Sequence, residues 1–182
     1  MKILVTDDNE CNRYQLQVLL SGSGYEVMTA ANGAEALDQA RQEAPDLIVA
    51  DILMPVMDGY SLCRVWKQDE RLRNIPFVFY TATYTDEQDR ELALRLGAQR
   101  FIVKPEEPDV FVRIIREVVA QAVPSPPAPA GALSAESSGG QGGSAAPTEA
   151  EYLHQYNAVL VRKLEQKLVE LEREVAERRR TE

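Results

Sequence analysis

The chain has 182 residues, of which 45% are hydrophobic and 27% are charged, so it can bury one ordinary core and leave a segment over. Its formal net charge of -9 argues against a broad nucleic-acid surface, because phosphate backbones require clustered Lys and Arg. An apolar run of about 18 residues is missing and acidic residues come too early for a secretory signal, so we expect a soluble, cytoplasmic protein.

Residues 1–122 alternate short apolar runs with amphipathic stretches, which is the pattern of βαβ units around a parallel sheet. The predicted strands are residues 2–6, 26–30, 47–50, 77–81 and 100–103. The predicted helices are residues 10–20, 33–43, 59–69, 86–96 and 109–123. The third and fourth strands are almost continuously apolar, as expected when helices cover both faces of a sheet. The pattern therefore predicts a three-layer α/β domain.

Residues 123–148 differ sharply in composition from the predicted domain. They contain five prolines, five glycines and a single charged residue, which indicates a flexible linker. The two cysteines, Cys11 and Cys63, belong to no CxxC or Cys/His cluster, so we expect small buried residues in a reducing compartment.

Residues 149–182 are rich in helix-forming residues and contain neither Gly nor Pro. Their apolar positions step by three and four, which defines the seam of this helix: Val161, Leu164, Leu168, Leu171 and Val175. Because β-branched residues at a and leucines at d favour two parallel strands, we expect a coiled-coil homodimer through residues 154–179. Two alternatives stay open, namely that the stripe docks on the domain or that the helix is a lone charged helix.

His154 is the only histidine of the chain, so a phosphotransfer role has to be considered. Its neighbours lack the acidic residue and the downstream Thr-Pro typical of phosphoacceptor helices. Projected back along the heptad, His154 falls at a seam position, where a single polar residue more often sets the register of a coiled coil. We favour the register role.

Polar residues follow or end four of the five predicted strands. Asp7 and Asp8 follow the first strand, and Asp51 follows the third. Thr81 ends the fourth strand and Lys104 follows the fifth. Because ligands of such sheets bind outside the carboxyl ends of the strands, we expect these side chains to converge. Three carboxylates at one edge require a counter-ion, and Mg²⁺ is the cation that this set of oxygens favours.

With part of its charge neutralised, the Asp51 carboxylate can attack phosphorus and form an acyl phosphate. The transferred group carries charge on three outer oxygens, and each oxygen needs a partner. We assign one oxygen to Mg²⁺, one to the Lys104 ammonium, and one to the Thr81 hydroxyl with nearby backbone N–H groups. We also expect Lys104 to pair with Asp51.

Four motifs in this region resemble those of bacterial two-component response-regulator receiver domains. They are Asp7-Asp8-Asn9, the run DILMPVMDG at 51–59, Thr81-Ala82, and the run FIVKP at 101–105. The resemblance spans residues 1–122 and implies a flavodoxin-like, doubly wound sheet of five parallel strands. The implied strand order is 2-1-3-4-5, with helices on both faces. The implied phosphodonor is a phosphohistidine on a sensor histidine kinase or a phosphotransfer protein.

The resemblance also implies roles for single residues. Asp51 is the implied phospho-acceptor, Asp7 and Asp8 are the acidic pair, and Asp8 is the more direct metal ligand. The backbone carbonyl of Leu53 is a further implied metal contact.

Thr81 and Lys104 are expected to report the phosphoryl group. Phe101 stands where the family often has a switching tyrosine, so we expect switching to depend on side-chain packing and on Thr81. Thr83 is expected at the mouth of the site. A cis peptide between Lys104 and Pro105 is suggested by the resemblance alone.

Three functional hypotheses follow from these observations. The first is a phosphorelay receiver, not an enzyme with a separate substrate, that passes its state to a dimerising helix or a partner. The second is an adaptor that uses the receiver fold only as a binding surface; the complete set of acidic-site residues argues against it. The third, a phosphatase of the haloacid-dehalogenase type, would need a DxD motif where residues 51–53 read Asp-Ile-Leu.

The end of the chain resembles the signalling helices that lead into PAS or histidine-kinase modules. We therefore expect either the amino-terminal part of a hybrid sensor kinase or a stand-alone protein with a dimerising tail.

Overall fold

A computed structural model describes residues 1–82, 86–104, 106–122 and 149–181. The strands are β1 (Lys2–Thr6), β2 (Glu26–Ala30), β3 (Leu47–Ala50), β4 (Phe77–Thr81) and β5 (Arg100–Val103). The helices are α1 (Glu10–Gly22), α2 (Gly33–Gln42), α3 (Gly59–Gln68), α4 (Glu87–Arg95), α5 (Pro108–Ala122) and α6 (Glu149–Thr181). All five predicted strands are confirmed with their bounds. The predicted linker at 123–148 lies outside the described residues.

The five strands form one parallel sheet in the order β2-β1-β3-β4-β5. This arrangement confirms the doubly wound fold and the strand order that the resemblance implied. The chain order reverses between β1 and β3, and in such sheets the crevice outside the carboxyl ends of these strands is the usual ligand site.

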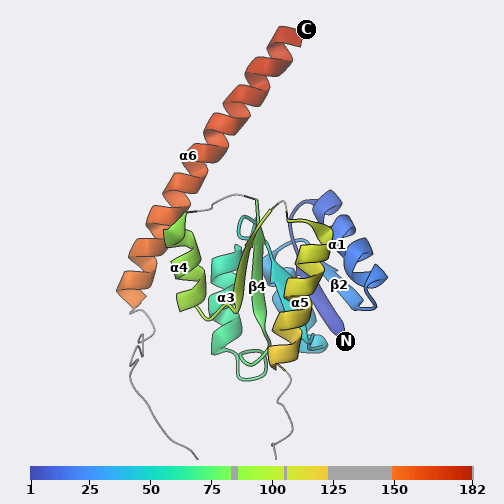
Figure 1. Cartoon of the computed structure of the whole chain (residues 1–182). Coiled ribbons are helices and arrows are strands. Elements are labelled where there is room, and N and C mark those ends of the chain that lie inside the picture. Colours follow the sequence, from blue (N-terminus) through green and yellow to red (C-terminus); the bar gives the residue numbers. More distant parts are fainter. Residues whose placement is uncertain (83–85, 105, 123–148, 182) are drawn as a thin grey trace, which may run out of the picture.

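Two core clusters lie on opposite faces of the sheet. Because side chains alternate along a strand, Ile3 and Val5 of β1 join the cluster formed with α1 and α5, whereas Leu4 joins the cluster formed with α2, α3 and α4. Trp66 of α3 is fully buried and meets Phe77 of β4 edge to face, with ring centroids 6.0 Å apart. Figure 1 shows the sheet between these two helical layers.

The ends of the helices follow from their capping residues. The side chains of Asn9, Asn32 and Asp58 accept backbone N–H bonds at the starts of α1, α2 and α3. Helix α1 extends two residues beyond the predicted end, to Gly22, because the N–H of Ser23 still bonds to carbonyls of the last turn. The other predicted helix ends differ by one residue where the structure describes them.

Helix α6 is a single helix that carries the predicted seam. The side chains of all five seam residues are exposed, with Leu168 at 59% and Val175 at 49%. The alternative in which this stripe docks on the domain is therefore not what the structure contains. In Figure 1 the first half of α6 lies beside α4 and the second half extends beyond the domain.

Two further sequence expectations can be compared with the structure. Both cysteines are free, but only Cys63 is buried; Cys11 is exposed, so the expectation of burial was wrong for it, because it lies on the outer side of the first turn of α1. Among the described helices, none combines the length and the apolar character needed to cross a membrane.

Candidate functional site

The polar residues predicted at the strand ends do meet at one edge of the sheet. Asp7 and Asp8 follow β1, and Asp51 follows β3. One carboxylate oxygen from each of these three residues lies within 4.8 Å of the other two. Thr81 ends β4, and the backbone N–H of Lys104 donates to the Thr81 carbonyl at 2.7 Å. Parallel pairing of β1, β3, β4 and β5 therefore assembles the site from four distant segments.

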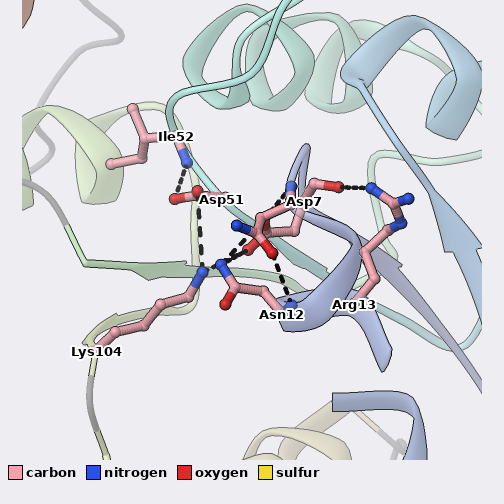
Figure 2. A network of polar contacts seen from close by, with 7 residues as sticks. Asp7, Asn12, Arg13, Asp51, Ile52 and Lys104 are labelled. Atoms are coloured by element: carbon pink, nitrogen blue, oxygen red, sulfur yellow. Dashed lines mark hydrogen bonds and ion pairs between the residues drawn. The ribbon is translucent and has the colours of Figure 1, made fainter. Parts of the chain in front are cut away.

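Asp7 is the fixed anchor of the acidic group, because its buried carboxylate accepts several hydrogen bonds. The backbone N–H of Asn9 donates to Oδ1 at 2.9 Å, and the Asn12 amide nitrogen lies 3.3 Å from both oxygens. The Arg13 guanidinium donates to the Asp7 backbone carbonyl at 2.6 Å. Figure 2 shows these contacts around Asp7. They leave the buried carboxylate with a defined orientation.

The Asp51 side chain is mostly buried, with 12% of its surface exposed. Its Oδ1 accepts the backbone N–H of Ile52 at 2.8 Å. Burial raises the pKa of the Asp51 carboxyl above its ordinary value, and the Asp7 carboxylate adds to this effect. The Lys104 ammonium, the Ile52 N–H and the Thr81 side chain lower the pKa, but their combined effect is smaller. The ionised form of Asp51 is therefore under-compensated by the protein alone.

Lys104 connects the acidic residues across the site. Its Nζ lies 2.5 Å from Asp7 Oδ2 and 3.9 Å from Asp51 Oδ2. The ammonium also lies over the Tyr80 ring, 5.1 Å from the centroid. The predicted pairing with Asp51 is present, but Asp7 is the closer partner, as Figure 2 shows. The ammonium lies closer to Asp7 because the Asp7 carboxylate is the more deeply buried of the two, and an unpaired charge costs more where less solvent can reach it.

The loop between β3 and α3 is packed tightly against Asp51. The Gly59 N–H donates to the Ile52 carbonyl at 2.8 Å, and a Cβ at Gly59 would lie 2.2 Å from the Asp51 carbonyl oxygen. Val56 adopts a φ of 68° within this loop. Leu53 lies in the same loop and is half-buried, so the sequence motif translates into a close backbone turn beside the acceptor.

Thr81 and Phe101, the predicted switch residues, differ in burial. Thr81 is fully buried at the end of β4, whereas Phe101 on β5 is half-buried. The Phe101 ring packs against Phe79, with centroids 6.2 Å apart. Thr83 and Pro105, which the sequence also singled out, lie outside the described residues.

The acidic group fits a hard divalent cation. Asp8 is exposed, so a cation can approach from solvent, while Asp51 is desolvated and lacks full charge compensation. Carboxylate oxygens at this separation are the donors that Mg²⁺ and Ca²⁺ prefer. The site is therefore an acidic cluster that can hold a metal.

Sequence reasoning missed three residues that shape the site: Asn12, Arg13 and Tyr80. Asn12 and Arg13 lie in the first turn of α1, where the Asn9 cap directs them toward the strand edge. Tyr80 lies beside Thr81, and with Lys104 it lines a cavity of about 550 Å³ between α1 and the start of α5. Only the Asn9 capping signal could have indicated the first two residues.

Comparison with known proteins gives a family model and several relatives. The response regulator receiver domain model matches residues 3–116. The alkaline phosphatase synthesis transcriptional regulatory protein PhoP of Bacillus subtilis is 43% identical over 107 residues, which are 59% of this chain and 43% of PhoP. The response regulator PleD of Caulobacter vibrioides is 41% identical over 114 residues, which are 62% of this chain and 25% of PleD. The chain thus spans less than half the length of these curated relatives.

A solved structure agrees with these matches. The signal receiver domain of a signal transduction histidine kinase from Syntrophus aciditrophicus is 33% identical, with a TM-score of 0.63. The alignment covers 72% of this chain and 98% of that chain. The family match covers most of the chain, and the sheet order and the acidic cluster agree with it. This chain belongs to the response regulator receiver domain family.

Proposed function

We propose that this protein acts in phosphorelay signalling by accepting a phosphoryl group on Asp51 in a Mg²⁺-dependent reaction. One observation carries the proposal: Asp7, Asp8 and Asp51 each place one carboxylate oxygen within 4.8 Å of the other two, and the Lys104 ammonium lies close to the oxygens of Asp7 and Asp51. A binding module that never handles phosphate has no physical need for this buried, under-compensated charge. The geometry therefore favours chemistry over the adaptor hypothesis.

In the proposed reaction, an Asp51 carboxylate oxygen attacks the phosphorus of a phosphohistidine. A new O–P bond forms as the P–N bond breaks, and the leaving imidazole takes up a proton. The hydrogen bond from Ile52 to Oδ1 fixes the carboxylate and leaves Oδ2 on the side of Lys104. The chain thus orients its nucleophile before the donor arrives.

We assign the metal to Asp8, Asp51 and, as implied by family resemblance, the Leu53 carbonyl, with Asp7 as the buried member of the acidic pair. A bound Mg²⁺ would neutralise carboxylate charge and contact an oxygen of the transferred group. Asp7 is held by Asn12 and Lys104, so it sets the position of the cluster rather than moving with the ligand.

Lys104 and Thr81 are proposed to contact the remaining phosphoryl oxygens. The Lys104 ammonium, 3.9 Å from Asp51 Oδ2, needs only a small movement to contact an oxygen on the acceptor. The backbone bond between Lys104 and Thr81 joins the two residues, so a shift in one affects the other. We propose that the Phe101 ring, packed on Phe79, repacks in response.

The partner in this proposal is a sensor histidine kinase or a phosphotransfer protein. The chain itself would be a stoichiometric acceptor that catalyses its own phosphorylation and dephosphorylation, not an enzyme with a separate substrate. We also propose a cytoplasmic location, since two free cysteines suit a reducing compartment. The exposed seam of α6 is proposed to pair with a second copy in parallel, as a tail or as the start of a signalling helix of a longer sensor kinase.

Incubation with Mg²⁺ and acetyl phosphate, followed by intact-mass measurement, tests the proposed chemistry. We expect the wild-type protein to gain one phosphoryl group and Asp51→Asn to gain none. Asp38→Asn, which alters an exposed aspartate on α2, is the matched control and should behave like the wild type. A chelator should abolish the gain.

A mass gain that persists in Asp51→Asn would reject the site assignment. Equal labelling with chelator and with Mg²⁺ would reject the metal. No labelling of any form, with the fold intact, would favour the adaptor hypothesis.

A further inference from the structure

Among the described residues, the contacts between helix α6 and the receiver domain include two polar pairs and one aromatic ring. The Tyr156 hydroxyl donates to Asp58 Oδ2 at 2.5 Å, and the Tyr156 ring packs against the core cluster on the α3 and α4 side. Six residues further on, the Arg162 guanidinium lies 2.5 Å from Asp86 Oδ2. Figure 1 shows this part of α6 alongside α4.

Both receiver residues lie at the starts of helices. Asp58 caps α3 through the backbone N–H groups of Tyr60 and Ser61. Asp86 occupies the cap position of α4 but makes no side-chain cap bond, and its carboxylate pairs with the Arg162 guanidinium instead. The α6 residues therefore contact one carboxylate that cap bonds already hold, that of Asp58, and one that makes no cap bond, that of Asp86.

The docked side chains and the seam lie on different sides of α6. With Val161 at heptad position a, Arg162 falls at b and Tyr156 at c, whereas the seam occupies a and d. The exposure of Tyr156 agrees, because Tyr156 is half-buried while Val161 and Leu164 are 56% and 57% exposed. Arg162 is paired with Asp86 but stays 47% exposed. The contacts of Tyr156 and Arg162 with the receiver therefore leave the seam residues exposed.

The Asp58 side of the surface that α6 contacts is also continuous with the loop between β3 and α3 (residues 51–58), which we call the acceptor loop. Asp58 precedes Gly59, whose backbone sits against the Asp51 carbonyl so closely that a Cβ would lie 2.2 Å from its oxygen. A displacement of this loop must therefore move the carboxylate that Tyr156 holds. The hydrogen bond between Tyr156 and Asp58 therefore connects α6 to the loop that begins at Asp51, the proposed phospho-acceptor.

We propose that the face of α6 bearing Tyr156 and Arg162 docks in cis on Asp58 and Asp86 of its own receiver, leaving the opposite seam face available to a second copy of the chain. The helix is then a stalk held in a fixed orientation to the acceptor site. The docking stands on the contacts alone, whereas the use of the seam by a second copy rests on the proposed function.

Distances between two spin labels on the full-length chain test the docking. Cysteines are introduced at Glu91 on α4 and Val169 on α6, both exposed, in a Cys11→Ser background, while Cys63 stays buried. Labelled protein is mixed with an excess of unlabelled protein, so that only distances within one chain are recorded. A docked helix gives a narrow distribution.

Two sets of variants make the test specific. Tyr156→Ala should broaden the distribution, whereas Tyr14→Ala, which truncates an exposed tyrosine on α1, should leave it narrow. Arg162→Asp should broaden it, and the added Asp86→Arg should restore the narrow form by reversing the pair. A narrow distribution that survives both Tyr156→Ala and Arg162→Asp, or a broad one in the parent protein, would overturn the proposal. So would failure of the reversed pair to restore it.

The oligomeric mass, measured by light scattering on the same samples, separates docking from dimerisation. Tyr156→Ala should keep the mass of the parent, since position c lies off the seam. A loss of mass in that variant would overturn the separation of the two faces. A monomeric parent with a narrow, pair-dependent distribution would support the docking while rejecting the proposed dimer.

Discussion

The Asp51 carboxyl lies among two other carboxylates and one ammonium at the strand edge, and burial raises its pKa. Its ordinary value is 3.8, so the folded protein binds this proton more tightly than the unfolded chain does. The stability associated with the carboxyl is therefore complete below the unfolded pKa and is lost as pH rises through the folded pKa. At neutral pH and without metal, the ionised Asp51 opposes folding.

We accordingly expect Asp51→Asn to stabilise the metal-free protein at neutral pH. The gain should be about 1 kcal/mol, or about 4 °C in melting temperature. The difference should vanish at acidic pH, where the wild-type carboxyl is protonated, and shrink when Mg²⁺ is added. Thermal unfolding over a pH series measures this. A variant less stable than wild type at neutral pH without metal would contradict the charge argument.

Lys104, unlike the ionised Asp51, stabilises the folded domain, because its ammonium lies 2.5 Å from the buried Asp7 carboxylate and compensates its charge. Replacement by methionine keeps the length of the side chain but leaves that carboxylate unpaired, which should destabilise the domain by about 3 kcal/mol. Mg²⁺ should recover more stability in Lys104→Met than in wild type, since a cation replaces the missing charge. Urea unfolding with and without Mg²⁺ measures both effects, and an unchanged midpoint would refute them.

At the scale of elements, the start of α3 and the acceptor loop depend on a close backbone approach. Gly59 is the first residue of α3, and a Cβ there would meet the Asp51 carbonyl oxygen at 2.2 Å and the Ile52 Cα at 2.9 Å. Backbone atoms cannot move aside as a flexible side chain can, so the sequence has no alternative to glycine here without moving Asp51.

Gly59→Ala should therefore destabilise the domain by about 3 kcal/mol and slow phosphorylation of Asp51. Gly22→Ala is the matched control: it also lies in a helix, but a Cβ there meets nothing within 4 Å. We expect the control to be neutral or to stabilise by about 0.5 kcal/mol. Urea midpoints and the rate of labelling by acetyl phosphate decide, and equal effects of the two alanines would contradict the close-approach argument.

At the scale of the whole molecule, the seam of α6 is an apolar stripe that a single chain leaves exposed to solvent. The five seam side chains of α6 are about half exposed in a single chain. An isolated helix cannot bury a narrow apolar stripe of this kind, so the stripe adds little to the stability of a single helix. Burial against a second copy is the simplest way to remove it from water.

Light scattering should therefore give a dimer for the full chain and a monomer for residues 1–122. Leu164→Asp with Leu171→Asp in the full chain should also give a monomer, because both d positions then carry a charge. Val169→Asp, which alters an exposed apolar residue off the seam, is the matched control and should stay dimeric. A full chain that is monomeric at all concentrations would reject the dimer.

The sequence by itself determined the strands and the residues at their ends, because these depend on local alternation and on motifs of fixed spacing. The order of the strands was implied by the family resemblance and is not encoded in local alternation. The strand-end positions of Asp7, Asp8, Asp51, Thr81 and Lys104 were enough to predict one shared site, since parallel strands bring their carboxyl ends to one edge.

Only the tertiary structure decided how these residues divide their contacts. Lys104 lies closer to Asp7 than to Asp51 because relative burial, which sequence does not encode locally, sets which carboxylate most needs the ammonium. The hydrogen bond from the Asn12 amide to the Asp7 carboxylate also depends on the burial of Asp7, which the local sequence does not show. The contacts of Tyr156 and Arg162 also required the folded chain, because they lie off the heptad seam and join segments far apart in sequence, where no periodic pattern predicts a partner.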